Sequence, residues 1–256
     1  MPENNTPSIL LAPTLASLGD DSRQVMNRLK TAGFRAVQLS ATTPGLRPRD
    51  LDQSARRDVR ATLKRNELSL SGIDLWIPVE HFLDPAHLDR ALGATREAIE
   101  LAADLGRCPL SMNLPRPDAG DENNESPAES LETIAGYAAH FGVEIADHSE
   151  AALQREQFGL GIDPAACLSR NEDPVSIVTS NPETLVSARL CDLLRSGMRG
   201  PVGDKAEGRL DVMAYRRALS VGGYARPVVV DTRQWSDPWG GLDQTKRVWE
   251  ATEALG

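Results

Sequence analysis

Short apolar segments alternate with longer amphipathic segments along almost the whole chain of 256 residues. Each apolar segment is rich in aliphatic or β-branched residues and is bounded by Gly, Pro, Asn or Asp, as β-strands are. The expected strands are residues 8–16, 35–41, 68–78, 109–115, 143–148, 158–163, 185–192 and 227–231.

The segments between these strands repeat apolar residues at steps of three and four, as amphipathic helices do. The clearest one begins at Asp84-Pro85 and ends at Gly106, which are typical first and last residues of a helix. The connection over 151–157 is left unassigned. The expected helices are residues 20–33, 49–67, 84–106, 127–142, 173–180, 210–224 and 242–256.

Eight strands that alternate with about seven helices predict an α/β protein with a single (β/α)8 TIM barrel. A doubly wound sheet is the alternative, but no Gly-x-Gly-x-x-Gly follows the first strand. We expect one domain over residues 1–256. Residues 118–130 are acidic and poor in apolar residues, which predicts a mobile loop after the fourth strand.

Composition excludes several classes of protein. A net charge of −9 disfavours nucleic acid as a partner. No apolar run approaches the roughly 20 residues of a membrane span, and the N-terminus lacks the pattern of a signal peptide, so a cytoplasmic location is expected. Three widely spaced cysteines, Cys108, Cys167 and Cys191, argue against a disulfide framework or a cysteine zinc site.

Function in a TIM barrel lies at the carboxyl ends of the strands. Because side chains alternate along a strand, Ala146 shares a face with His148, whereas Asp192 lies off the face of Arg189. The polar and aromatic candidates at these strand ends are Asp74, Trp76, Glu80, His81, Asn113, Asp147, His148, Asp163, Arg189, Asp192, Asp231 and Arg233.

Several strand-end segments are similar to those of a known family. They are FRAVQLSA (34–41), DLWIPVEHFLDPAHLDRAL (74–92), GIDPAACL (161–168), RLCD (189–192), PVGDKAEGRLDVMAYRRAL (201–219) and YARPVVVDTR (224–233). Their order resembles the xylose isomerase-like TIM-barrel superfamily, from about residue 8 to the end. That superfamily includes sugar and sugar-phosphate isomerases and epimerases and endonuclease IV-type enzymes. The resemblance implies a role in carbohydrate metabolism.

The resemblance also implies a divalent metal held by a Glu on strand five, an Asp on strand six, a His on strand seven and a Glu on strand eight. The corresponding residues here are Ala146, Asp163, Arg189 and Asp231, and Ala166 replaces a further His of strand six. Asp192 is the Asp that follows strand seven. The candidate metal ligands are therefore Asp163, Asp231 and Asp192.

Alanine has no donor for a cation, and arginine adds a positive charge where the cation would sit. We therefore expect a degenerate site without a metal rather than one that holds Mn, Mg, Co or Zn. Asp163 and Asp231 would repel one another without a cation. We predict that Arg189 bridges the two carboxylates and leaves a pocket for a hydroxylated or anionic ligand.

Two alternatives remain open. Asp163 and Asp231 can each instead cap the helix that follows, and a shift of two residues in strand five would make Glu144 the metal ligand.

Lys205 lies in a glycine-rich loop, which can either contact an anion or be a mobile surface loop. The expected catalytic residues are Asp231, His148 and Asp163, and the expected substrate-binding residues are Trp76, His81, Asn113, Arg189, Lys205 and Arg233.

Two functions remain open, the first implied by the family resemblance and the second favoured by the missing metal ligands. The first is an isomerase or epimerase that transfers a proton within a sugar, sugar phosphate or polyol. The alternative is a non-catalytic barrel that serves as a carbohydrate-binding sensor or assembly partner. Both have a small-molecule carbohydrate ligand and neither needs a nucleic acid or a membrane; an oligomer is compatible with either.

Overall fold

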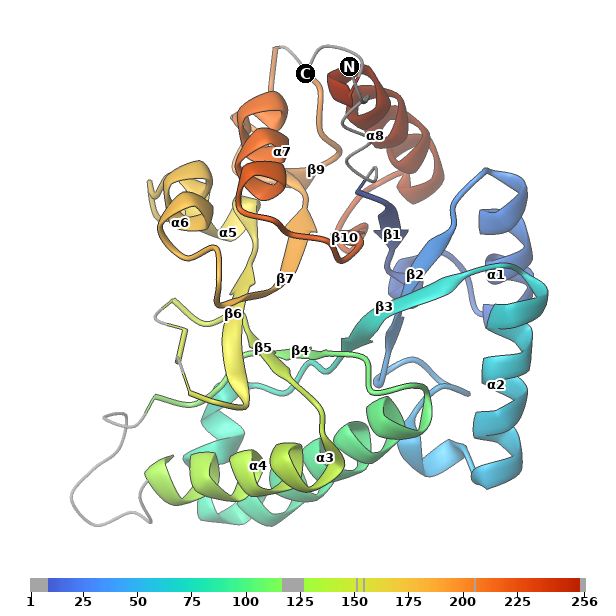
Figure 1. Ribbon diagram of the computed structural model, residues 1–256, viewed down its shortest axis with the longest axis vertical. Helices are drawn as coiled ribbons and strands as arrows, with labels where there is room; N and C mark the ends of the chain where they lie inside the picture. The colour runs from blue at the N-terminus through green and yellow to red at the C-terminus, as the bar shows by residue number, and fades with distance from the viewer. Residues whose placement is uncertain (1–8, 117–126, 151, 154, 205, 254–256) are drawn as a thin grey trace, which may run out of the picture.

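The computed structural model describes residues 9–116, 127–150, 152–153, 155–204 and 206–253. Eight parallel strands form one sheet in the order β1-β10-β7-β6-β5-β4-β3-β2. A parallel bridge between Thr14 and Gln38 joins the two outer strands, so the sheet curls into a nearly closed barrel (Figure 1). The strands are β1 (Leu11–Pro13), β2 (Ala36–Ser40), β3 (Ser69–Asp74), β4 (Leu110–Met112), β5 (Ile145–Asp147), β6 (Phe158–Ile162), β7 (Leu185–Leu190) and β10 (Val228–Val230).

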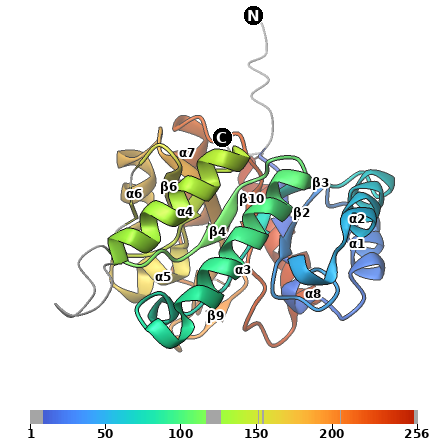
Figure 2. The same ribbon diagram turned by 90° about the horizontal axis from the view of Figure 1, so that it is seen from below.

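Helices cover the outside of the barrel. The α-helices are α1 (Ser22–Thr31), α2 (Gln53–Arg65), α3 (Pro85–Asp104), α4 (Pro127–Phe141), α5 (Pro164–Ser169), α6 (Pro174–Ser180), α7 (Val212–Val221) and α8 (Pro238–Glu253). Short 3-10 turns occur at η1 (Leu15–Ser17), η2 (Pro48–Asp50) and η3 (Val79–Phe82). Neighbouring helices pack in pairs, as α3 and α4 show in Figure 2. An aspartate side chain caps the N-terminus of many of them, for example Asp21 at α1 and Asp84 at α3.

The predicted TIM barrel is confirmed, and the doubly wound alternative is wrong because the outer strands meet. Each expected strand contains one observed parallel strand, with shorter bounds. The expected strand 185–192 is divided: β7 ends at Leu190, and β8 (Asp192–Leu193) forms an antiparallel hairpin with β9 (Arg199–Gly200). The short helix α5, which follows β6, was not predicted.

The acidic segment 118–130 was expected to be a mobile loop. Its residues 118–126 lie outside the described residues. Residues 127–130 form the first turn of α4, where Ser130 and the adjacent Leu131 are buried, so the loop prediction is wrong for these four residues. Within the described part of the chain, no helix is both long enough and apolar enough to span a membrane.

Small residues lie side by side on three neighbouring strands of the barrel. Ser111 of β4 lies in register with Ala146 of β5, which lies in register with Gly159 of β6. The hydroxyl of Ser111 donates a hydrogen bond to that of Ser187 across the barrel at 3.4 Å. Apolar side chains fill the layer between strands and helices instead. The fold therefore places polar side chains and free space at the same end of the barrel.

Candidate ligand-binding site

A cavity of about 550 Å³ opens at the carboxyl ends of the strands. Its size is within the range of about 300–1,000 Å³ that is usual for small-ligand sites. Polar and aromatic side chains from at least six strand ends and loops line it: Ser40, Thr42, Asp74, Trp76, Asn113, His148, Asp163, Arg189, Arg199, Asp231, Arg233 and Gln234.

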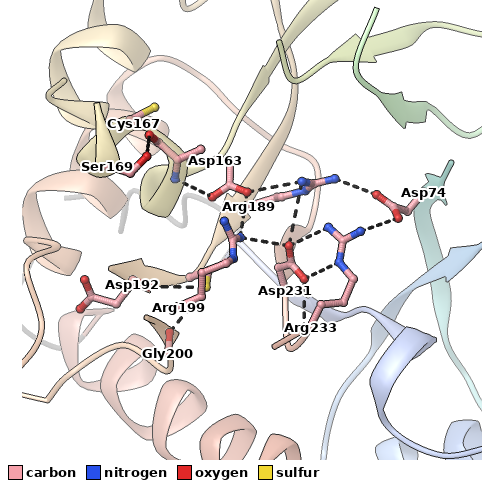
Figure 3. A network of polar contacts seen from close by, with 12 residues as sticks. Asp74, Asp163, Cys167, Ser169, Arg189, Asp192, Arg199, Gly200, Asp231 and Arg233 are labelled. Atoms are coloured by element: carbon pink, nitrogen blue, oxygen red, sulfur yellow. Dashed lines mark hydrogen bonds and ion pairs between the residues drawn. The ribbon is translucent and has the colours of Figure 1, made fainter. Parts of the chain in front are cut away.

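Arg189, on β7, lies at the centre of a polar network on the wall of this cavity (Figure 3). Its Nη2 donates a hydrogen bond to Oδ1 of Asp74 at 2.7 Å, and its Nη1 donates one to Oδ2 of Asp163 at 3.4 Å. The same Nη1 lies 3.9 Å from Oδ2 of Asp231. One guanidinium therefore contacts carboxylates at the carboxyl ends of three different strands.

Two further arginines complete the network. Arg199, on β9, donates from Nη2 to Asp163 at 2.8 Å and to Asp231 at 3.1 Å. Arg233 holds both carboxylate oxygens of Asp231, at 2.8 and 2.7 Å, and also donates to Asp74 at 2.8 Å. Three carboxylates and three guanidiniums thus share at least seven contacts, and their formal charges balance.

The carboxylates are only 2–8% exposed, so their ionisation depends on these arginines. Burial raises the pKa of Asp74, and this effect exceeds the opposing charges of Arg189 and Arg233. Burial acts in the same direction on Asp231, but the hydrogen bond from Arg233 and the charges of all three arginines hold its pKa well below the usual range. Asp231 is therefore a stable anion, whereas Asp74 more readily accepts a proton.

His148, which directly follows β5, is the other titratable side chain of the cavity. Its ring packs on Gly161 so closely that a Cβ at that position would lie 2.5 Å from the ring. Both ring nitrogens are buried without a hydrogen-bond partner among the described residues. Burial, followed by the positive charges of Arg189 and Arg233, lowers the pKa of His148 well below its ordinary value. The imidazole is therefore neutral at pH 7.

The model of the family described as xylose isomerase-like TIM barrel matches residues 26–156, which is about half of the chain. The chain belongs to this family. The match includes Asp74, Ala146 and His148 but ends before β6, so Asp163 and the three arginines lie beyond it. No curated protein matches the chain.

Solved structures show the same fold over nearly the full length. A xylose isomerase domain protein from Planctomyces limnophilus is 16% identical, with a TM-score of 0.69, over 97% of this chain and 96% of the other. An L-ribulose 3-epimerase is 15% identical over 97% of both chains, with a TM-score of 0.71. A D-psicose 3-epimerase crystallised in the presence of D-fructose is 12% identical, with a TM-score of 0.71, over 96% and 99%.

The donor set does not fit the divalent metal that the family resemblance implies. Ala146, at the strand-five position, is buried and offers no donor, and Asp163 and Asp231 are each bound by arginine. No group of three or more His, Cys, Asp or Glu side chains suited to a metal occurs among the described residues. A cation at this position would have to displace Arg189 and Arg199, so we derive no chemistry through a metal.

The alternative register of strand five is wrong. Glu144 precedes β5, at the end of the barrel opposite the cavity, and its side chain is half exposed. It pairs there with Arg226, which precedes β10. Glu144 therefore does not contribute to the site. Asp163, by contrast, has both expected roles. It binds arginines in the network, and its Oδ1 caps α5 by accepting the N–H of Ala166.

The structure brings most of the expected site residues to the cavity. Trp76 and Asn113 line it together with the network and His148. The side chain of Asp192 turns away and accepts the N–H groups of Arg209 and Leu210, which organises the loop that follows and corrects its assignment as a metal ligand (Figure 3).

Two further positions differ from expectation, and a third lies outside the described residues. His81 does not reach the cavity, because η3 turns its ring against that of His87, with centroids 4.7 Å apart. Lys205 lies outside the described residues. Arg199 was not predicted, since it lies within the polar stretch 195–200, where no apolar pattern indicates the hairpin that carries it.

Proposed function

We propose that the protein is a sugar or sugar-phosphate isomerase/epimerase-like protein that binds a small carbohydrate in the barrel-mouth cavity without a divalent metal. The observation that carries this proposal is the position of Arg189. Its guanidinium supplies positive charge among Asp74, Asp163 and Asp231, where the family resemblance implies a cation.

The cavity suits a hydroxylated ligand. Guanidinium groups donate hydrogen bonds and carboxylates accept them, so the network can match sugar hydroxyls in both directions. Trp76 is 63% exposed at the cavity and offers an apolar surface on which a sugar ring can pack. Two of the solved structures that share the fold are named as sugar 3-epimerases, which supports this choice of ligand class.

The proposed chemistry is proton transfer next to a sugar carbonyl. The proposed base is His148, because its imidazole is neutral and neither ring nitrogen has a hydrogen-bond partner among the described residues. Asp231 is held as an anion by its arginines, and the guanidiniums of Arg189 and Arg199 stabilise negative charge on the sugar oxygen. A cytoplasmic location and one domain over residues 1–256 belong to this proposal.

One observation favours the second candidate, a non-catalytic carbohydrate sensor. A two-base epimerisation needs a base on each face of the sugar, and Ala146 stands where the resemblance places one of them. Binding alone requires only the network and the cavity. The two candidates therefore share a ligand and differ in turnover.

The test begins with thermal unfolding of the protein in EDTA against a panel of ketoses, aldoses and their phosphates. A ligand that binds only the native state raises the melting temperature. Any sugar that does so is then incubated with protein in D2O, and deuterium incorporation at carbon is followed by NMR. Incorporation that is lost in His148→Gln supports the isomerase, and binding without incorporation supports the sensor. Absence of binding by every sugar refutes both.

A further inference from the structure

A second cavity, of about 470 Å³, lies next to the first, between β6, α5 and α6. Three residues, His148, Asp163 and Ala166, line both cavities. The wall between the two spaces is therefore formed by the end of β5 and the first turn of α5. The volume of the second cavity alone is within the range of small-ligand sites.

Ala166 is the smallest part of this wall. It lies in the first turn of α5, its side chain is a single methyl group, and the residue is only half-buried. Because Asp163 caps the helix through the N–H of Ala166, the backbone at this point is fixed. Ala166 is the smallest of the three residues that line both cavities, so a larger side chain there would thicken the wall between them.

His148 lies at the same junction and lacks hydrogen-bond partners there. Both of its ring nitrogens are buried, and neither meets a donor or acceptor among the described residues. Buried polar atoms are nearly always paired, and leaving one unpaired is unfavourable because it has lost its hydrogen bonds to water. His148 lines both cavities, so a ligand hydroxyl that displaced the atoms covering its ring nitrogens would satisfy this ring.

The second cavity has the mixed character of a sugar subsite. Ile177 of α6 and the outer face of β6 provide apolar surface. Arg170 and Ser176 provide polar groups at the same cavity. This combination of an apolar face with polar groups around it suits a ring that carries hydroxyls.

We propose that the ligand is longer than one sugar ring and extends from the barrel-mouth cavity past Ala166 into the second cavity, so that His148 contacts it at the junction of its two parts. The substrate class is then a disaccharide or another glycoside, with its reacting unit at Arg189. This proposal rests on the function proposed above and specifies the size of its ligand.

The test compares monosaccharides with disaccharides that contain the same unit, beginning with D-fructose, lactulose, maltulose, isomaltulose and turanose and extending to matched aldose pairs. Affinities are measured by calorimetry in EDTA for the wild type, Ala166→Leu and Ala166→Phe. Ser169→Phe is the matched control, because Ser169 lies on the same short helix, is exposed and lines neither cavity. Thermal unfolding verifies that each variant is folded.

We expect at least one disaccharide to bind about tenfold or more tightly than its monosaccharide, a difference of about 1.4 kcal/mol. Ala166→Phe should remove that difference by weakening disaccharide binding far more than monosaccharide binding, Ala166→Leu should reduce the difference, and Ser169→Phe should preserve it. Monosaccharides that bind as tightly as every disaccharide, or an equal loss for both classes in Ala166→Phe, would overturn the extended ligand but not carbohydrate binding. Failure of both classes to bind would overturn both proposals.

Discussion

Replacement of Arg189 by methionine removes the group that joins the three buried carboxylates. Methionine keeps much of the length of the side chain but donates no hydrogen bond. Among the arginines, Asp74 then contacts only Arg233, and Asp163 contacts only Arg199. Three carboxylates would share two guanidiniums, so one negative charge is left without compensation in a buried site.

Removal of one partner of a buried ion pair costs about 3–5 kcal/mol, because the other charge stays desolvated. At about 2–4 °C per kcal/mol for a chain of this size, Arg189→Met should lower the melting temperature by about 6–20 °C. Arg23→Met is the control, since Arg23 pairs with Asp58 on the surface, and exposed pairs contribute about 0–1 kcal/mol. For both variants, the free energy of unfolding is measured in urea and the melting temperature by heating, each followed by circular dichroism at pH 7.

The loss of stability in Arg189→Met should also depend on pH, and in a defined direction. Burial already raises the pKa of Asp74, and loss of the Arg189 charge would raise it further. A carboxyl whose folded-state pKa is raised stabilises the fold below its unfolded-state value, and this stabilisation is lost as the pH rises through the folded-state value. Arg189→Met should therefore be less destabilising at pH 5 than at pH 8, and adding Asp74→Asn should restore part of the stability. A cost no larger than that of Arg23→Met, or one independent of pH, would refute this reasoning.

Other substitutions test the remaining parts of the site. Asp231→Asn should destabilise more than Asp74→Asn in urea at pH 7, because the arginines favour the charged form of Asp231; this advantage is present above pH 3.8 and is lost as the pH falls towards the lower folded-state pKa. The reverse order would contradict these charge states. The ring signals of His148, assigned by NMR with His148→Gln, should not shift between pH 5.5 and 8, and a titration with a midpoint near 6.5 would contradict its burial. Gly161→Ala should destabilise the fold by about 1–3 kcal/mol through contact with the His148 ring, and the cost should shrink in a His148→Ala background; equal costs in both backgrounds would place the strain elsewhere.

Sequence periodicity was sufficient for the barrel because each strand is a short apolar run bounded by turn residues. The carboxyl ends of the strands placed Asp163, Arg189 and Asp231 at one end of the barrel, and the family resemblance singled them out among the other strand-end residues. These inferences needed only local pattern, that resemblance and the rule that strands end at a common face.

The rest of the site depends on contacts that no local pattern contains. Asp74 meets Arg189 only because the barrel closes and brings β3 opposite β7. Arg199 reaches the network through β8 and β9, strands of two residues that have no apolar repeat. His81 was expected near the ligand from its distance after a strand, but a 3-10 turn redirects its side chain.

Calorimetric titration of the wild-type protein with Mn²⁺, after treatment with a chelator, tests the arginine-filled site most directly. The triple variant Ala146→Glu/Arg189→His/Arg199→Met is the positive control, because it restores two ligands of the implied metal site and removes both arginines that a cation would have to displace. We predict no binding to the wild type and binding to the triple variant. Binding of one Mn²⁺ per wild-type chain, lost in Asp163→Asn and in Asp231→Asn, would contradict the account.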